Sequence, residues 1–386
     1  MSRNYLLGIF ILLLLISQVS LVSAQPFPFF SSQDQQRKML PNPITSNRQL
    51  IDVVASFVNH PVPFAHLNKN PTSTSFLPEN LTFSDDAYHG SNKTYATEWW
   101  YFDAALNQGY TVQFGIHIHH IISTGIATIH CNIYHHGQPI INERLIQPLS
   151  TLSLSSQEPF ITINNEIIMQ GFQNSQGKPD KYHISYSGDN YAFDLTYNGI
   201  TEGWKGSTAA GDWAVILPKA IVQGSLTIKN TTTKCLGTGY HDHNWNVTAS
   251  TGLNFGWLWG KTSISNYTLT WANIFETWYK GSPLLVINKE HNGYLNIPSN
   301  NLQFSVTDIS FKNGMIVPYG FTLSGNTQNH SFSLKITVLN SDYITVLGLI
   351  NYWRYHIHIT GTFTIDDETE TVNDYNIAEF IRFRPY

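Results

Sequence analysis

Residues Thr111–His120, TVQFGIHIHH, carry the clearest structural signal in this chain. Apolar side chains occupy every second position: Val112, Phe114, Ile116 and Ile118. The intervening positions are mostly polar: Thr111, Gln113, His117 and His119. Because successive side chains of a β-strand point to opposite faces, this period of two predicts a strand with two different faces.

Similar stretches recur from Glu98 onward: ITINNEIIMQ, YHISYS, YAFDLTY, SLTIKN, YTLTWANIF, FSVTDISF, FSLKITVL, YHIHITGTFTI and AEFIRF. Turn sequences such as Ser-Gly-Asp-Asn, Lys-Asn-Gly and Ser-Gly-Asn lie between them, and no long amphipathic helical stretch interrupts them. The pattern predicts an all-β chain with largely antiparallel pairing. Its strand-rich part is too long for one small barrel and suits two.

The pattern of the first 24 residues indicates a signal peptide. One Arg precedes an apolar run from Leu6 to Ile16, and Val22-Ser23-Ala24 fits the small-residue rule for cleavage. A retained anchor is the alternative, but the run is shorter than the roughly 20 residues that a membrane-spanning helix needs. Residues 25–94 are rich in Pro, Ser, Asn and Gln with little periodicity, and they predict an irregular arm that packs on something else. We therefore expect a secreted or cell-surface protein.

Other features suit an exported chain. Asn-x-Ser/Thr sequons, which suit a secreted glycoprotein, occur at Asn80, Asn92, Asn230, Asn246, Asn266 and Asn329. The two cysteines, Cys131 and Cys235, allow at most one internal disulfide, and the sequence leaves its presence open.

The composition limits the range of partners. Charged residues make up 12% of the chain, about half the usual share, whereas aromatic residues reach 13%. The formal net charge is -5 and no Lys/Arg cluster occurs, so the electrostatic signature of a nucleic-acid-binding protein is missing. So many aromatic side chains suit a large core or an apolar pocket, and we expect a hydrophobic ligand, with peripheral contact to a membrane as a further expectation.

The stretch Gly237–Asn246, GTGYHDHNWN, concentrates polar and aromatic groups. In an extended conformation His241, His243 and Trp245 share one face, while Asp242 and Asn244 share the other. The chain contains three His-x-His pairs: His117/His119, His241/His243 and His356/His358. Each pair offers two imidazoles on one side of a strand, so a His-rich metal site is one hypothesis, and hydrogen-bonded histidines on a polar barrel face are the other.

The sequence lacks the motifs of serine hydrolases and of nucleotide-binding enzymes, so acid/base catalysis and simple ligand binding are the functions that we consider. No Gly-x-Ser-x-Gly elbow and no dinucleotide or phosphate loop occurs. Next to Trp245 and Tyr240, partial desolvation would raise the pKa of Asp242 or lower the pKa of His243 toward the working pH. The structural alternative is that Asp242 caps a turn and Trp245 fills the core.

Two motifs together carry a family resemblance. Thr97–Phe102 (TEWWYF) and Gly109–Phe114 (GYTVQF) are followed well over 100 residues later by Gly239–Trp245 (GYHDHNW). Gly256–Gly260 (GWLWG) follows, and the C-terminal pattern consists of Trp353, Gly361 and Glu379. From about Tyr95 to Tyr386 the chain resembles the carotenoid 1,2-hydratase (hydroxyneurosporene synthase) and AttH-like family.

The resemblance implies two lipocalin-like antiparallel barrels in tandem, expected at residues 95–248 and 249–386, with an apolar cavity at or near their junction. Members of the family include hydratases that protonate a terminal isoprenoid alkene, and similar folds serve fungal pericyclic cyclases that act on polyenes. Neither activity needs a metal or an organic cofactor, and none is expected here. Hydration of an unactivated alkene requires a strong acid, π-rich side chains beside the carbocation and a positioned water.

The resemblance also implies site residues. His243 and Trp245 match two active-site positions of the hydratases, and Trp271 and Asn273 align with a Tyr-x-Asp whose Asp is the proposed proton donor. An amide cannot protonate an alkene, so this departure requires Asp242 or Glu276 to supply the proton, or predicts a carrier that has lost the acid. We expect Asp242 to orient other groups rather than to act as the acid.

Three hypotheses follow. The leading one is an exported tandem-lipocalin protein that binds an isoprenoid, polyene or lipid-like ligand, with cofactor-independent hydro-lyase or isomerase/cyclase activity as its enzymatic extension. The others are a non-catalytic carrier and a His-rich metalloprotein. Aromatic residues expected to contact the ligand are Trp99, Trp100, Tyr101, Tyr240, Trp257 and Trp259. His243 and Trp245 are expected to face the inter-barrel cavity.

Overall fold

The computed structural model describes most of the chain beyond the N-terminal arm. The described residues are 76–91, 96–121, 124–208, 210–248, 256–275, 281–313, 315–327, 330–346, 350–365 and 368–382. The predicted signal peptide, most of the predicted arm, Glu276 and the sequons at Asn92 and Asn329 lie outside these ranges. Within them, no helix has the length and apolar character that crossing a membrane requires.

Most of the described residues form strands, and none forms an α-helix. The first sheet has 13 strands, of which eleven form a continuous path. In spatial order these are β5 (Gln138–Pro148), β4 (Thr124–His135), β3 (Tyr110–Ile121), β2 (Thr97–Leu106), β13 (Thr231–Val247), β12 (Gly211–Ile228), β10 (Tyr191–Gly199), β9 (Pro179–Ser187), β8 (Glu166–Gln173), β7 (Phe160–Ile163) and β6 (Leu152–Leu154). Two strands lie off this path: β11 (Trp204–Thr208) pairs with β12, and β1 (Glu79–Asn80) pairs with β11.

The second sheet has nine strands. In spatial order they are β17 (Tyr294–Ile297), β16 (Gly281–Lys289), β15 (Tyr267–Phe275), β14 (Gly256–Ile264), β22 (Glu368–Arg382), β21 (Ile350–Ile365), β20 (His330–Val346), β19 (Met315–Asn326) and β18 (Leu302–Lys312). All of the pairs are antiparallel.

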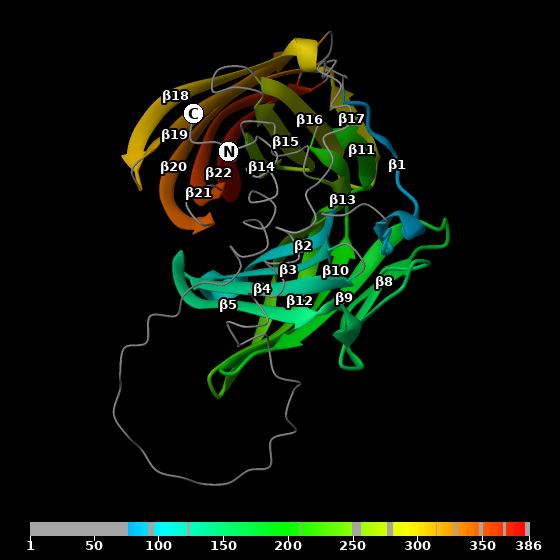
Figure 1. Cartoon of the computed structure of the whole chain (residues 1–386). Coiled ribbons are helices and arrows are strands. Elements are labelled where there is room, and N and C mark those ends of the chain that lie inside the picture. The colour runs from blue at the N-terminus through cyan, green and yellow to red at the C-terminus, as the bar shows by residue number, and fades with distance from the viewer. Residues whose placement is uncertain are drawn as a thin grey trace, which may run out of the picture.

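Both sheets follow the same path. Each is an up-and-down meander whose first strand pairs with its last, β2 with β13 and β14 with β22. A short 3-10 turn joins the two edge strands, Leu149–Thr151 in the first sheet and Ser299–Asn301 in the second. The first sheet forms a nearly closed barrel and the second a half-barrel (Figure 1). The prediction of an all-β, tandem lipocalin-like fold is confirmed, although the second barrel is open.

Each sheet has a glycine with a positive φ angle in its penultimate strand. Gly224 of β12 and Gly361 of β21 have φ angles of 154° and 152°. A Cβ atom would lie 2.0 Å from the Asp194 carbonyl oxygen at Gly224, and 1.9 Å from that of Ser333 at Gly361. Only glycine tolerates this conformation and approach without strain, so both sheets require a glycine at the matching position.

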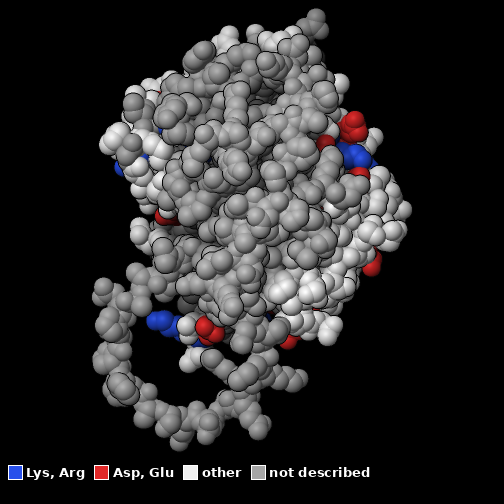
Figure 2. Space-filling view, viewed as in Figure 1, with Lys and Arg blue, Asp and Glu red and all other residues white. Residues whose placement is uncertain are grey.

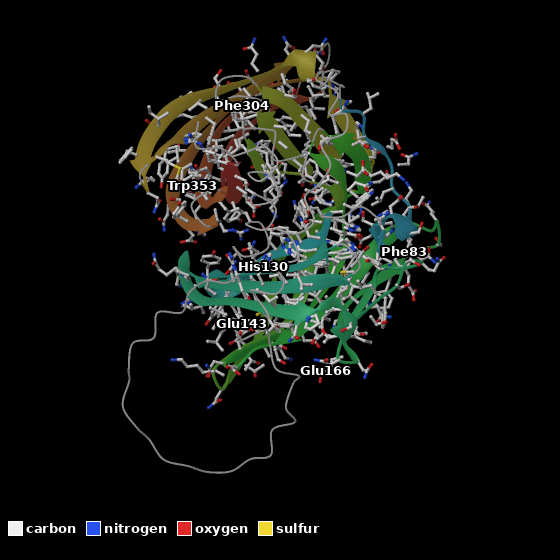
Figure 3. All side chains as sticks on the ribbon, viewed as in Figure 1. Phe83, His130, Glu143, Glu166, Phe304 and Trp353 are labelled. Atoms are coloured by element: carbon white, nitrogen blue, oxygen red, sulfur yellow. The ribbon has the colours of Figure 1, made fainter. Side chains whose placement is uncertain are left out.

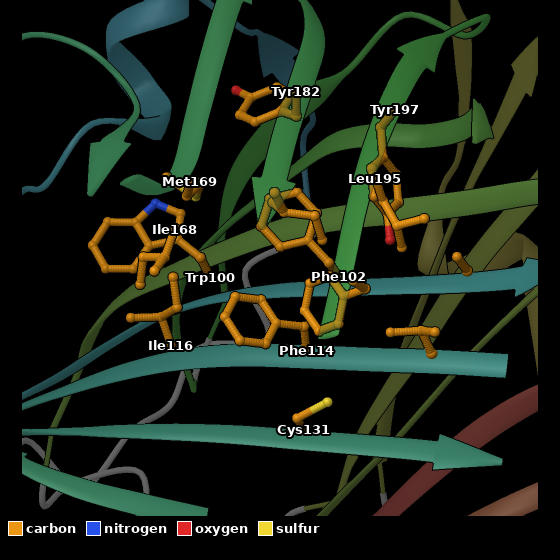
Figure 4. Close-up of a cluster of buried hydrophobic side chains, with 14 of the residues drawn as sticks. Trp100, Phe102, Phe114, Ile116, Cys131, Ile168, Met169, Tyr182, Leu195 and Tyr197 are labelled. Carbon is orange, nitrogen blue, oxygen red and sulfur yellow. The ribbon is translucent and has the colours of Figure 1, made fainter. Parts of the chain in front are cut away.

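Alternation along the strands separates three apolar clusters. The predicted apolar face of β3 lies inside the first barrel, where Phe114 packs on Phe193 and the neighbouring Phe102 packs on Tyr197 (Figure 4). A second cluster, including Trp271, Trp353 and Phe380, fills the half-barrel (Figure 3). The third lies between the two sheets and is called the junction cluster: Phe76, Tyr101, Trp204, Trp213, Val215, Tyr240, Trp259, Ala272, Leu284, Val286 and Ile377.

The end of the predicted irregular arm belongs to the first barrel. Residues 79–80 form β1, and Phe83–Asp86 forms a 3-10 turn that carries Asp86 into the barrel with no exposed surface. The two cysteines, Cys131 and Cys235, are both buried and free. Acidic and basic side chains lie scattered over the described surface seen in Figure 2, in keeping with the low charge of the sequence.

Candidate functional site

Strand β13 separates two sets of functional groups. Its Tyr240 belongs to the junction cluster, and Asp242 accepts a hydrogen bond from that side chain. The neighbouring His241 and His243 point the other way, where they stack on Phe102 and Trp100 of the first barrel's core. The predicted alternation of Gly237–Asn246 is therefore present, but the histidines face the barrel interior and Asp242 faces the second sheet.

Two acids and two imidazoles form a group inside the first barrel, called the interior quartet: Asp86, Glu98, His241 and His243. Their side chains are almost completely buried. Asp86 Oδ2 lies 2.9 Å from His241 Nε2, and Asp86 Oδ1 lies 3.3 Å from His243 Nδ1. Glu98 Oε1 lies 3.0 Å from His243 Nε2. Glu98 also accepts hydrogen bonds from the backbone N–H groups of residues 89 and 90, so the quartet ties the chain before β2 to the barrel.

The hydrogen-bond partners define the charges of the quartet. His241 Nδ1 lies 2.9 Å from the Tyr101 carbonyl oxygen, which can only accept, and its Nε2 faces the Asp86 carboxylate. Each ring nitrogen of His241 therefore faces an oxygen atom of a buried partner. Burial opposes the charge on His243, but Asp86 and Glu98 outweigh it and raise its pKa to about 9. Burial likewise opposes the charge on Asp86, yet His241 and His243 hold its pKa far below the usual range.

Asp242 occupies the opposite environment. Its Oδ2 accepts hydrogen bonds from Tyr240 Oη at 2.9 Å and Trp213 Nε1 at 3.1 Å, and its Oδ1 accepts one from Asn244 Nδ2 at 3.3 Å. These donors are neutral. Lys261 lies close by, but its Nζ donates to Asp103 Oδ1 at 2.5 Å.

The pKa of Asp242 is raised to about 7. Burial is the largest cause, and the charges of Glu379 and Asp103 add to it, while the bonds from Tyr240 and Trp213 oppose it. A carboxyl group with this pKa is about half protonated at neutral pH, so it can act as a general acid.

The second sheet brings a buried ion pair to the same junction. The Arg354 guanidinium donates to Glu379, and its Nη2 donates to Tyr352 Oη at 3.0 Å and Tyr101 Oη at 3.3 Å. Tyr352 Oη in turn donates to Glu379 Oε1 at 2.8 Å. Glu379 is therefore paired with a cation, whereas the hydrogen-bond donors to Asp242 are neutral.

Aromatic rings line this polar group. The ring of Trp259 lies 5.2 Å from that of Tyr240 and 5.9 Å from that of Tyr101, and Trp99 and Trp257 pack at the edge of the cluster. Five of the six predicted aromatic ligand contacts lie at the junction; the exception is Trp100, which lies inside the first barrel.

The predicted active-site residues do not come together. His243 lies in the first barrel, so the prediction that it faces the junction is wrong. Trp245 is only partly buried; it packs against the first barrel and stacks on His89 at 4.1 Å, so its predicted place at the junction is also wrong. Trp271 and Asn273 point into the second barrel, on the same side of β15 as Phe275. The two halves of the expected site therefore lie on the inner sides of different sheets.

The sequence alone does not identify several polar and aromatic side chains of the junction: Trp213, Asp103, Lys261, Tyr352 and Arg354. None of them stands in a short motif, and strand pairing brings them together. Glu379 belongs to the C-terminal pattern of the family resemblance, but that pattern does not indicate a function for its side chain.

The metal hypothesis gains no geometric support. Among the residues that the structure describes, no three His, Cys, Asp or Glu side chains converge as metal ligands. The His241/His243 pair is engaged with carboxylates instead.

The fold and the junction define a class of protein: two lipocalin-like sheets in tandem with an acid-bearing aromatic interface. No protein-family model and no curated protein sequence matches this chain. Solved structures match at the level of the fold.

An AttH candidate from Nitrosomonas europaea, NE1406, shares 13% identity and a TM-score of 0.59, and the match covers 79% of this chain and 98% of that one. CghA, whose crystal structure was determined with Sch210972, shares 11% identity and a TM-score of 0.53 over 76% of this chain and 89% of its own. Kievitone hydratase from Nectria haematococca shares 14% identity over 79% and 96%, but its TM-score of 0.48 is too low to add to the assignment. The chain is therefore similar in fold to an AttH-type protein.

Proposed function

We propose that this protein binds a hydrophobic isoprenoid, polyene or lipid-like ligand at the junction of its two sheets and adds water to one of its alkenes without a cofactor. The observation that carries the proposal is Asp242, a buried carboxyl group with a pKa raised to about 7 among the rings of Tyr101, Tyr240 and Trp259. Isomerisation or cyclisation would begin with the same proton transfer.

The proposed reaction uses Asp242 as the acid. The carboxyl proton forms a C–H bond at the less substituted alkene carbon, which leaves a tertiary carbocation at the other. The electron-rich faces of the neighbouring aromatic rings stabilise that cation. Water then forms the C–O bond, and its surplus proton returns to the Asp242 carboxylate, so the acid is restored and the alkene has gained one water.

Glu379 supplies the complementary group. Because Arg354 and Tyr352 hold it, Glu379 remains a hydrogen-bond acceptor that can orient the attacking water. Two carboxyl groups with opposite environments divide the acid and acceptor roles, as in other enzymes that pair carboxyl groups.

Labelled water tests the proposal. The wild-type protein is incubated with acyclic isoprenoid alkenes in heavy-oxygen water, and product alcohols are analysed by mass spectrometry. Asp242→Asn should lower label incorporation by at least about 100-fold, the contribution expected of a general acid. Asp194→Asn is the matched control, because Asp194 is an exposed carboxylate of the same sheet paired with His183. Equal incorporation by wild type and Asp242→Asn would overturn the role of Asp242.

A non-catalytic carrier is the second candidate. The aromatic junction cluster alone offers an apolar surface that stabilises a bound ligand by burial. Ligand recovered in organic extracts of the purified protein, together with no labelled alcohol from any alkene, would favour the carrier.

Export is a separate part of the proposal, and so is peripheral contact with a membrane. Four sequon asparagines, Asn80, Asn230, Asn246 and Asn266, are exposed, as glycosylation requires. N-terminal sequencing of secreted protein should begin at Gln25, and glycosidase treatment should lower its mass.

A further inference from the structure

Three histidines on the outer face of the first sheet have no role in the proposed proton transfer. His117 and His119 belong to β3, and His130 belongs to β4. The rings of His117 and His130 lie 4.8 Å apart, those of His117 and His119 lie 6.1 Å apart, and Trp99 stacks on His117. We call these three side chains the histidine row.

The row faces the second sheet. The neighbours of His130 along β4, Ile129 and Cys131, point into the first barrel, so His130 points away from it. Figure 3 places His130 on the side of the first sheet that faces the half-barrel. Tyr134, on the same face of β4 as His130, lies 5.3 Å from His356 of the second sheet between ring centroids, so this face of β4 meets that sheet.

Gly115 makes room for the row. A Cβ atom at Gly115 would lie 2.2 Å from His130 Cε1 and 2.6 Å from its Nε2, so the imidazole lies directly over the β3 backbone. Gly115 pairs with Tyr101 on its other side, and Tyr101 pairs with Asp242. Asp242 and His130 therefore stand in one row of the sheet, three strands and about 14 Å apart at about 4.8 Å per strand.

The three imidazoles are neutral. Burial, together with the charges of Arg144 and Arg354, holds the pKa of His130 far below its usual value. Burial is also the main cause of the low pKa of His117 and His119. A neutral imidazole has one N–H donor and one nitrogen acceptor, so the row can both give and receive hydrogen bonds.

Two ring nitrogens in the row have no hydrogen-bond partner among the residues that the structure describes. The Nε2 atoms of His117 and His119 are buried and make no such bond. The side chain of His119 is 3% exposed, and its other ring nitrogen, Nδ1, lies 3.3 Å from Thr97 Oγ1. Buried polar atoms in native proteins are nearly always satisfied. A group that supplies both a donor and an acceptor would satisfy neutral imidazoles of this kind.

We propose that the histidine row binds a hydroxyl group at one end of the ligand, so that the ligand is a long apolar alcohol rather than a pure hydrocarbon. The proposal rests on ligand binding at the junction as set out above. A chain that spans the row and Asp242 would place its hydroxyl group over β3 and β4 and its reacting alkene over β13.

Matched probes test the proposal by equilibrium binding, with quenching of tryptophan fluorescence as the readout. The probes are geranylgeraniol, its methyl ether and the parent hydrocarbon. The ether can accept a hydrogen bond but cannot donate one. The wild-type protein should bind the alcohol at least about tenfold more tightly than either analogue, which corresponds to about one hydrogen bond.

Variants assign this preference to the row. His117→Phe and His119→Phe should remove the preference for the alcohol and leave affinity for the hydrocarbon unchanged, and His119→Gln should keep part of it. Gly115→Ala, which displaces the His130 ring, should also weaken alcohol binding. His183→Phe, a half-exposed histidine on β9, is the control and should behave as wild type. Far-ultraviolet circular dichroism confirms that each variant is folded.

The outcomes separate this proposal from hydration. Equal affinity for alcohol, ether and hydrocarbon in the wild type, absence of binding by all three, or a preference that persists in both Phe variants would overturn the hydroxyl site. A preference that depends on the row would support it even if no labelled alcohol forms. If hydration depends on Asp242 but the protein does not prefer the alcohol, the proposed reaction is supported and the hydroxyl site is refuted.

Discussion

Asp242 on β13 and Asp86 beside it are both buried aspartates, yet their pKa values shift in opposite directions. Asp86 lies on the inner side of the first barrel between two imidazoles, which keep it charged. Asp242 lies on the outer side, where burial raises its pKa, its neutral donors oppose this only in part, and the charges of Glu379 and Asp103 add to the rise. Burial alone does not determine the charge of an acid; the charges of its partners decide.

The largest expected effect is the difference in stability between two variants, one without the Asp86 carboxyl group and one without the Asp242 carboxyl group. At pH 7, Asp86→Asn should destabilise the fold by about 3–5 kcal/mol, because it breaks a buried ion group and leaves imidazoles without their counterion. Asp242→Asn should raise stability at this pH, since an amide replaces a carboxyl group that is costly to ionise. Urea unfolding measures both, and Asp194→Asn should stay within about 0.5 kcal/mol of wild type. A similar loss of stability in Asp86→Asn and Asp242→Asn would contradict the claim that the two aspartates carry different charges in the folded protein.

The pH dependence of Asp242 tests its side of the comparison. Folded Asp242 keeps its proton up to about pH 7, whereas the unfolded carboxyl loses it near pH 3.8. Folding therefore binds a proton between these values, and this contribution to stability falls as the pH rises from about 4 to about 7. At about 1.4 kcal/mol per pKa unit, the change is at most about 4 kcal/mol.

Unfolding of wild type and Asp242→Asn across this range gives the difference directly. The two proteins should be nearly equal at pH 4, and the variant should become the more stable one toward pH 7. A constant difference would show that Asp242 titrates normally.

His243 tests the interior quartet over a higher range of pH. Its folded pKa of about 9 lies above the unfolded value of 6.5, so its stabilising contribution is complete below about pH 6.5 and is lost as the pH rises through 9. The expected loss is about 3 kcal/mol at about 1.4 kcal/mol per pKa unit. In His243→Gln this decline should disappear. A wild-type protein whose stability relative to the variant does not fall between pH 6.5 and 9 would contradict a charged His243.

Asn273→Asp gives the smallest expected effect and tests the inner face of the other sheet. Asn273 is 4% exposed inside the second barrel, and a carboxyl group there should destabilise the fold by about 1–3 kcal/mol. Because this side chain does not face the junction, the substitution should not restore hydration to Asp242→Asn. Label incorporation in heavy-oxygen water by the double variant checks this, and regained activity would move the acid to the second barrel.

Much of the fold follows from local sequence. Period-two alternation in stretches such as Thr111–His120 determines strands with one buried face, and the absence of helical periodicity excludes α-helical layers. The same alternation correctly separates His241 and His243 from Asp242. These features depend only on neighbouring residues, so the sequence alone determines them.

The candidate site depends on distant pairings that local patterns do not contain. Nothing in Gly237–Asn246 says which face of β13 meets the second sheet; the pairing of β2 with β13 and the packing of Trp259 against Tyr240 decide it. Asp86 comes from a segment without periodicity, yet it determines the charge of both histidines. Tertiary structure alone made one aspartate an ion and the other an acid, because a pKa depends on charges and solvent that the fold brings together.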